Sequence, residues 1–130
     1  MTVLRVSSAG PWEDAFGYSR AVIAGPHGYV SGCTAVLDGV VHHEGDPYQQ
    51  ALTAFGVALD ALAQGGFGPE DVVRTRMYVT HTRDVEAVGR AHKKLFDAFR
   101  PAATMVVVAK LIDPQMLVEV EVDAYREGAR

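Results

Sequence analysis

Residues 100–125 read RPAATMVVVAKLIDPQMLVEVEVDAY, and the interpretation of the fold starts from this stretch. The run at 104–109 is apolar at almost every position, which is typical of a central strand covered on both faces. After a turn at 110–115, residues 116–125 alternate strictly between apolar and acidic side chains, as a strand with one buried face does. The acidic row is therefore either the wet face of a sheet or part of a functional site.

The carboxylates of this row belong to Glu119, Glu121 and Asp123. A purely structural explanation is cross-strand pairing with Arg74 and Arg76, which share the polar face of another predicted strand. This explanation accounts well for two carboxylates, but it does not require that all three be paired. Whether Glu119 is free or tied to an arginine therefore separates a functional from a structural interpretation.

Two helices are predicted. The first begins at Asp46-Pro47, because aspartate caps a helix well and proline suits the first helical position, and it ends at Gly65-Gly66. The second runs from about residue 84 to 99 and stops before Pro101. The apolar stripe of the first helix comprises Leu52, Phe55, Leu59 and Leu62, and that of the second comprises Val85, Val88, Leu95 and Phe99.

The remaining segments predict strands and loops. The further strands lie at 2–6, 18–24, 28–33 and 71–80, with Gly25-Pro26-His27 as a hairpin turn and 34–37 as an extension of the third strand. Residues 7–16, which include Trp12, and 38–45 are expected to be loops. In the strand at 71–80, Val73, Thr75, Met77 and Val79 are expected to oppose Arg74, Arg76 and Tyr78.

This element order predicts an α+β fold with a five- to six-stranded mixed sheet. Two helices side by side span roughly 20 Å, which covers one face of such a sheet but not both. The other face would keep apolar residues in water, so self-association through that face is expected.

Composition sets bounds on the function. At 130 residues, with 48% apolar and 22% charged side chains, the chain is expected to form a single globular domain over 1–130. A formal net charge of −4 argues against nucleic acid as the main partner. No apolar run reaches membrane-span length, and the N-terminus lacks the pattern of a signal peptide. Together with the single cysteine, Cys33, these features predict a soluble cytoplasmic protein.

No cofactor or metal site is predicted. Five histidines are present, but none has a partner at a chelating spacing, and the adjacent His42 and His43 point apart on an extended chain. Cys33 is interpreted as a small buried hydrophobe and not as a nucleophile.

Five segments together resemble the YjgF/Rid (reactive intermediate deaminase) family: Tyr18-Ser19, Ser31-Gly32, 73–79, 100–102 and 118–121. The resemblance implies a chorismate-mutase-like homotrimer with pockets between the subunits. It also implies hydrolysis of enamines and imines to a keto acid and ammonia, without metal or cofactor. Tyr18, Ser31 and the backbone of Gly32 would line the pocket, and Glu119 would act on the water.

The chain departs from this family at one position that decides the substrate. Deaminating members carry Arg-Pro-Ala-Arg-Thr, whose second arginine grips the substrate carboxylate, and here that position is Ala103. Arg100 lies three residues earlier, about 10 Å away on an extended chain. The usual asparagine of the second helix corresponds to Gly89. A simple α-imino acid is therefore not the expected substrate, unless Arg100 or Arg20 supplies the anchor.

Two functions remain open at this point. One is an enzyme that hydrolyses an imine, an enamine or a related metabolite, with Ala103, Met105 and Arg100 bordering the substrate. The other is a trimer that binds a metabolite without turning it over. Family members have also been labelled ribonucleases and translation inhibitors, but the acidic balance gives that function no support.

Overall fold

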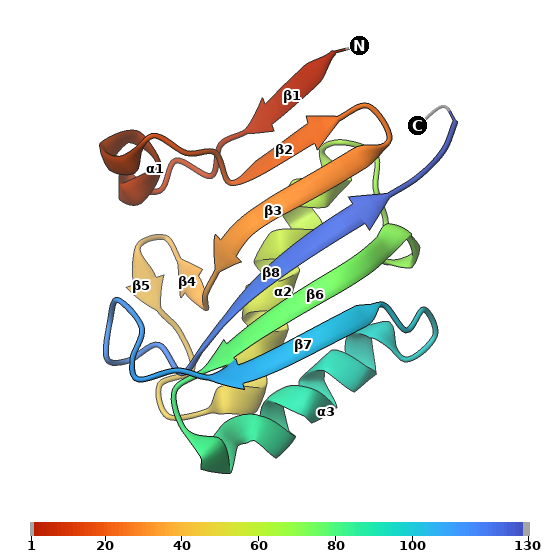
Figure 1. The fold of residues 1–130 in the computed structure, drawn as a ribbon. Coiled ribbons are helices and arrows are strands. Elements are labelled where there is room, and N and C mark those ends of the chain that lie inside the picture. The colour runs from red at the N-terminus through yellow and green to blue at the C-terminus, as the bar shows by residue number, and fades with distance from the viewer. Residues whose placement is uncertain (1, 129–130) are drawn as a thin grey trace.

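The order and pairing of the strands place the carboxylate-bearing strand near the middle of a mixed sheet. The computed structural model describes residues 2–128, and its six-stranded sheet runs in the order β1-β2-β3-β8-β6-β7 (Figure 1). Every neighbouring pair is antiparallel except β6 and β7, which are parallel. The strands are β1 (Val3–Val6), β2 (Ala21–Ala24), β3 (His27–Cys33), β6 (Val72–Val79), β7 (Ala102–Val107) and β8 (Val118–Tyr125).

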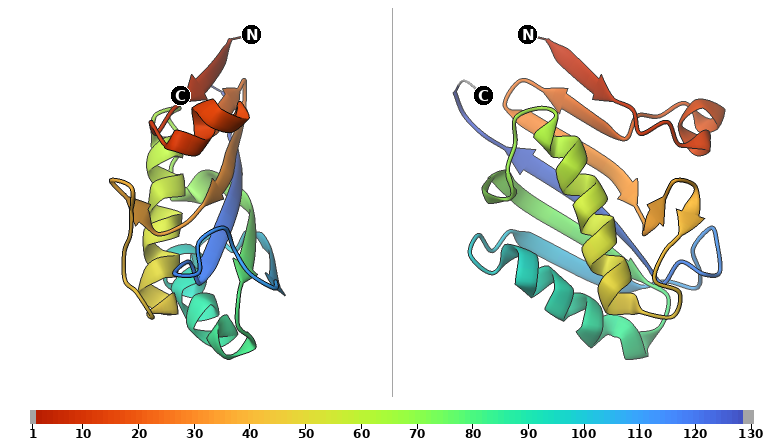
Figure 2. Two further views of the ribbon diagram at one scale, coloured as in Figure 1. Left: turned by 90° about the vertical axis from the view of Figure 1, so that its left-hand side faces the viewer. Right: turned by 180° about the vertical axis from the view of Figure 1, so that it is seen from behind.

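Two long helices cover one face of this sheet. They are α2 (Pro47–Ala63) and α3 (Val85–Phe96), and they pack against each other on the same side (Figure 2). The opposite face of the sheet carries no helix in residues 2–128. The predicted α+β class, with two helices on one face of a six-stranded mixed sheet, is confirmed.

Strand β8 has the predicted alternation. The side chains of Val118, Val120 and Val122 are fully buried beneath the helices, whereas Glu119 and Glu121 on the opposite face are partly exposed. Full burial of three valines in the middle of the sheet fixes the register of β8, because a slip by one residue would place carboxylates in the core. The positions of the acidic side chains are thus set by the core.

Strand β7 differs from its prediction. The apolar run predicted a central strand, but β7 is an edge strand with β6 as its one neighbour. Only Met105 is partly buried, while Val106 and Val107 are 42% and 48% exposed. An apolar run shows that a strand needs cover, but it does not reveal whether the cover comes from the same chain.

The two helices follow their predictions with one correction. In α2 the side chain of Asp46 accepts a hydrogen bond from the backbone N–H of Gln49 at 3.0 Å, and Phe55 and Leu62 are fully buried. In α3 the predicted inner residue Phe99 is wrong, because the helix ends at Phe96, and Phe96 is buried in its place. Phe99 lies beyond the helix and is 43% exposed.

Three local predictions are corrected. The segment expected to be a loop at 7–16 contains the short helix α1 (Pro11–Phe16), because the buried carboxylate of Glu13 accepts backbone N–H groups from Ser8 and Gly10. The expected extension of β3 and the loop after it instead form a hairpin of β4 (Val36–Leu37) and β5 (Val40–Val41). A register shift between β6 and β8 turns Val73 outward, so that it is 48% exposed.

Candidate functional site

The open face of the sheet brings the carboxylates of β8 opposite the polar side chains of β6. Glu119 faces Tyr78 in the register, and Glu121 faces Arg76. Pairing with arginine explains only one carboxylate, since Arg76 Nη1 lies 3.4 Å from an oxygen of Asp123. Glu121 instead accepts a hydrogen bond from the hydroxyl of Tyr78 at 2.5 Å. Among residues 2–128, no group donates a hydrogen bond to the carboxylate of Glu119 or forms an ion pair with it.

A β-bulge in β3 brings the backbone of Gly32 against this unpaired carboxylate. Val30 of β3 pairs with Val122 of β8, and Cys33 pairs with Val120. The two residues of β3 in between, Ser31 and Gly32, are therefore both opposite a single residue of β8, Glu121. A Cβ atom at position 32 would lie 2.0 Å from Oε2 of Glu119. Only glycine allows so close an approach of backbone and carboxylate.

Arg20 stabilises the bulge by hydrogen bonds to its backbone. Its guanidinium donates to the carbonyl of Gly32 at 2.5 Å and to that of Ser31 at 3.3 Å. The hydroxyl of Ser31 donates to the carbonyls of Ser19 and Arg20 at 2.9 and 3.0 Å. The side chain of Arg20 is 12% exposed and lies 3.9 Å from Glu13. Arg20 and Ser31 therefore fix the shape of the bulge, and their polar groups are occupied in doing so.

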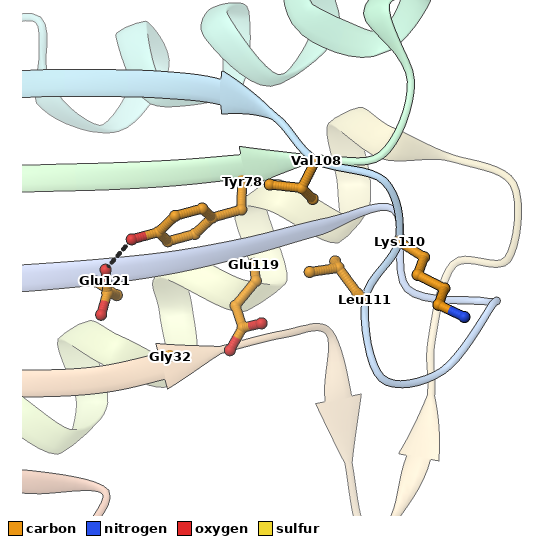
Figure 3. A pocket seen from close by; sticks show the side chains of 7 residues that line it. All are labelled: Gly32, Tyr78, Val108, Lys110, Leu111, Glu119 and Glu121. Carbon is orange, nitrogen blue, oxygen red and sulfur yellow. Dashed lines mark hydrogen bonds between the residues drawn. The ribbon is translucent and has the colours of Figure 1, made fainter.

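Glu119 opens into a hollow of about 260 Å³ at the end of the sheet (Figure 3). Burial raises the pKa of Glu119, and so does the nearby charge of Glu121, whereas Arg20 acts in the opposite direction. The pKa of Tyr78 is raised mainly by the hydrogen bond that its hydroxyl donates to Glu121. The hollow is lined by Gly32, Tyr78, Val108, Lys110, Leu111, Glu119 and Glu121.

A second hollow, of about 550 Å³, lies at the other end of the sheet between β1, β2 and the end of α2. Its lining is apolar or uncharged, with Gln64 and Thr2 as its polar side chains. Without an ionisable group it offers no acid or base. The smaller hollow is therefore the candidate site for acid–base chemistry.

The structure brings together only two of the predicted site residues, Gly32 and Glu119. Ala103 and Met105 pair with Thr75 and Met77 of β6, whose side chains are buried under the helices, so they lie on the face opposite Glu119. The other predicted binding residues do not line the hollow of the same chain.

Tyr18 and Arg100 lie on exposed parts of the chain. The ring of Tyr18 is 38% exposed and has the guanidinium of Arg20 at 5.8 Å from its centroid. Arg100 donates to a carboxylate oxygen of Asp97 at 2.9 Å, and its side chain is 77% exposed. Neither arginine that was considered as a substitute anchor is thus free beside Glu119.

Sequence reasoning missed Tyr78 and the loop after β7 as parts of the site. Tyr78 carries a signal, since the alternation of β6 places it on the polar face, but the predicted cross-strand pairing involves only Arg74 and Arg76. The structure places Tyr78 opposite Glu119. The loop of Val108, Lys110 and Leu111 carries no local signal, because a side chain from elsewhere holds it in place. That side chain is Gln50 of α2.

Gln50 is fully buried and connects α2 to the loop before β8. Its amide donates to the carbonyl of Gln115 at 2.9 Å and to that of His43 at 3.3 Å. Its carbonyl oxygen accepts the backbone N–H of Leu117 at 2.9 Å. A buried amide that satisfies three backbone groups far apart in sequence fixes the path of the chain there.

Cys33 is buried beneath the bulge, with 2% of its surface exposed. Burial raises the pKa of its thiol to about 11, against the opposing effect of Arg20. A thiol with so high a pKa is a poor nucleophile, which confirms the interpretation of Cys33 as a small hydrophobe.

The described part of the chain also bears on metals and membranes. Within residues 2–128, no three side chains of His, Cys, Asp or Glu gather closely enough to hold a metal ion. None of the helices in that range is both long and apolar enough to span a bilayer.

Comparison with known proteins gives a consistent family relationship. The family model described as endoribonuclease L-PSP matches residues 12–126. An uncharacterised protein of Streptomyces coelicolor is 53% identical, over 95% of this chain and 92% of its own length. The RutC family protein UK114 of Drosophila melanogaster is 30% identical over 92% of this chain and 88% of its own.

The comparison with solved structures agrees with this relationship, and a structure with 42% sequence identity is an example. It is that of Rv2704 from Mycobacterium tuberculosis, described as a member of the highly conserved YjgF/YER057c/UK114 family. The two chains are 42% identical and superpose with a TM-score of 0.87, over 96% of this chain and all of Rv2704.

Proposed function

The chain belongs to the YjgF/Rid family, described also as endoribonuclease L-PSP, and from that premise we propose that it hydrolyses the imine or enamine form of a small metabolite. The observation that carries the proposal is Glu119, a partly buried carboxylate that has no hydrogen-bond partner among residues 2–128 and faces an open hollow. Structural carboxylates in a sheet are usually paired, as Glu121 and Asp123 are. An unpaired one beside a cavity is suited to proton transfer.

The chemistry needs one acid–base group. A protonated Glu119 gives its proton to the imine nitrogen, and the resulting carboxylate then takes a proton from the water that attacks the imine carbon. The C–O bond forms, the C=N double bond becomes a single bond, and the product is a carbinolamine. Glu119, protonated again by the water, gives its proton to the carbinolamine nitrogen; the C–N bond breaks and ammonia leaves, while the hydroxyl proton returns to Glu119 as the C=O bond forms. Burial and the charge of Glu121 raise the pKa of Glu119, which favours the protonated form that the first half of this cycle needs.

The donor that stabilises the adduct would come from the bulge and its surroundings. The backbone of Gly32 lies against Glu119, so a small substrate in the hollow would contact both strands. Rigid strands on either side favour this arrangement, since acid–base catalysis is sensitive to misplacements of about 1 Å.

We propose further that the complete site lies between subunits of a chorismate-mutase-like homotrimer. The uncovered face of the sheet and the exposed apolar edge of β7 support self-association. Tyr18, Ala103, Met105 and Arg100 lie away from the hollow of their own chain, so they would reach a hollow only on a second copy. This arrangement would reconcile their expected role with their positions.

The substrate is proposed not to be a simple α-imino acid. Ala103 offers no guanidinium, Arg20 is bonded to the bulge, and Arg100 is bonded to Asp97. A charge-assisted bidentate pair contributes roughly 2–4 kcal/mol, or about thirty- to several-hundred-fold in kcat/KM. The space that an arginine side chain would fill at position 103 is instead available to an uncharged or positively charged group of the substrate.

The direct test is ammonia release from imines generated in situ by an amine oxidase or an amino-acid oxidase. We expect the wild type to act on amine-derived imines and Glu119→Gln to lose at least about a hundredfold in kcat/KM, because the amide cannot exchange a proton. Glu86→Gln on the exposed side of α3 is the matched control and should match the wild type. Ala103→Arg should improve activity on α-imino acids.

Full activity of Glu119→Gln would contradict the proposal. The alternative is a trimer that binds a metabolite without catalysis. Specific binding of a ligand at Glu119 with no ammonia release from any imine would favour that alternative, because the open hollow and its single unpaired carboxylate are equally compatible with binding alone.

A further inference from the structure

The charges around the hollow are predominantly negative. Glu119 and Glu121 both line it, and Lys110 is the cationic side chain in the lining. Lys110 is exposed, and its ammonium group points away from Glu119 (Figure 3). The neighbouring guanidinium of Arg76 is directed to Asp123, and that of Arg20 donates to the carbonyls of the bulge.

Tyr78 keeps the charge of Glu121 in a fixed place. Its ring lies along the hollow, and its hydroxyl donates to Oε1 of Glu121 across the two central strands β6 and β8 (Figure 3). The second oxygen of Glu121 has no hydrogen-bond donor among the described residues and is available to a ligand.

The wall that the loop contributes to the hollow is apolar. Val108 and Leu111 contribute hydrocarbon side chains, and Leu111 extends toward Glu119 (Figure 3). A cavity of about 150 Å³ is large enough for benzene. The hollow, at about 260 Å³, therefore has room for a compact ligand with one apolar part and one polar end.

We infer that the hollow selects its ligand by positive charge, as the protonated imine that proton transfer from Glu119 produces or as another planar nitrogen cation, with Glu121 as the specificity-determining carboxylate and Tyr78 as the residue that positions it. This inference rests on the hollow of the proposed function and names the substrate class. Among the described residues of one chain, no guanidinium lines the hollow, and two acidic side chains, Glu119 and Glu121, do. A substrate carboxylate would be repelled by the same charges.

Three probes of nearly equal shape and different charge test the inference. Benzamidine is a planar cation, benzamide is neutral, and benzoate is an anion. Binding to the full-length wild type is measured by calorimetry, and the site is located by amide chemical-shift changes around Gly32 and Glu119. We expect benzamidine to bind about tenfold more tightly than benzamide, and benzoate to bind more weakly than either.

Variants assign the effect to residues. Glu121→Gln should weaken benzamidine about tenfold and leave benzamide within about twofold, since only the charge is removed. Tyr78→Phe should weaken benzamidine about threefold, because Glu121 keeps its charge but loses its fixed position. Lys110→Gln should strengthen benzamidine about twofold, and this variant remains informative if a change at Glu121 impairs folding. Glu86→Gln is the control.

The inference is overturned if benzoate binds as tightly as benzamidine, if Glu121→Gln leaves the charge preference unchanged, or if none of the probes shifts the amides around Glu119. Because this readout is binding, it is independent of turnover. Failure to release ammonia would count against the proposed reaction alone, and a missing charge preference with normal turnover would count against this inference alone.

Discussion

At the scale of single residues, the site depends on contacts that a sequence reveals only in part. A glycine inside a strand pattern indicates a bulge or a close approach, and Gly32 fulfils both. The alternation of β8 places Glu119 and Glu121 on one face, but it cannot tell which is paired. The hydrogen bond from Tyr78 to Glu121 makes that distinction, and it depends on the register between two strands more than 40 residues apart.

Replacement of Gly32 by alanine tests the close approach. The new Cβ would overlap Oε2 of Glu119, so the flexible carboxylate must rotate away. We expect a loss of at least about tenfold in kcat/KM and a loss of about 1 kcal/mol or less in the free energy of unfolding, measured by denaturant titration.

The matched control is Gly56→Ala in α2. Open space surrounds a Cβ at position 56, so the same chemical change should leave activity unaltered there and stabilise the helix by about 0.5–1 kcal/mol. If Gly32→Ala retains wild-type activity, the contact between the bulge and Glu119 has no functional role.

At the scale of elements, the sequence predicts the helices and strands that have a clear apolar face of their own. Helix α2 and strand β8 follow their predictions because their apolar periodicity is unambiguous. The helix α1 was missed, since it is held by Glu13 from a loop and has little apolar face of its own. The loop after β7 was missed as a part of the site because Gln50, on another element, determines its path.

Gln50→Leu should therefore loosen that loop. The substitution keeps a similar volume but leaves buried backbone groups at Leu117 and Gln115 without partners, which costs about 2–4 kcal/mol in the free energy of unfolding. Amide hydrogen exchange should become faster over residues 110–117. Gln49→Leu, at the neighbouring exposed position, should change neither quantity by much. Unchanged exchange in Gln50→Leu would show that the loop is held by other contacts.

At the scale of the whole molecule, α2 and α3 cover one face of the sheet, and the other face carries no helix in residues 2–128. The sequence predicted two helices on one face of the sheet, and the structure has them there. It could not predict that the most apolar strand lies at the edge, because an apolar run does not show whether its cover comes from the same chain or, as in the proposed trimer, from another copy. The positions of Ala103 and Met105 away from Glu119 have the same origin.

The proposed trimer has a clear signature in solution. Light scattering at micromolar concentration should give a mass of about three times the 14.0 kDa of one chain. Val106→Glu places a charge on the exposed part of β7 and should shift the protein toward smaller species, with some loss of activity. A stable, active monomer would contradict both the trimer and a site between subunits.

The claim on which the account depends is that Glu119 is an unpaired carboxylate in the hollow, with a pKa raised by burial and by the charge of Glu121. Titration of the glutamate carboxyl carbons by NMR measures this without knowledge of the substrate. The account predicts that Glu119 titrates above its ordinary value of 4.5 and that Glu121→Gln moves its pKa down, because a like charge is removed. A pKa of Glu119 at or below 4.5, unmoved by Glu121→Gln, would contradict it.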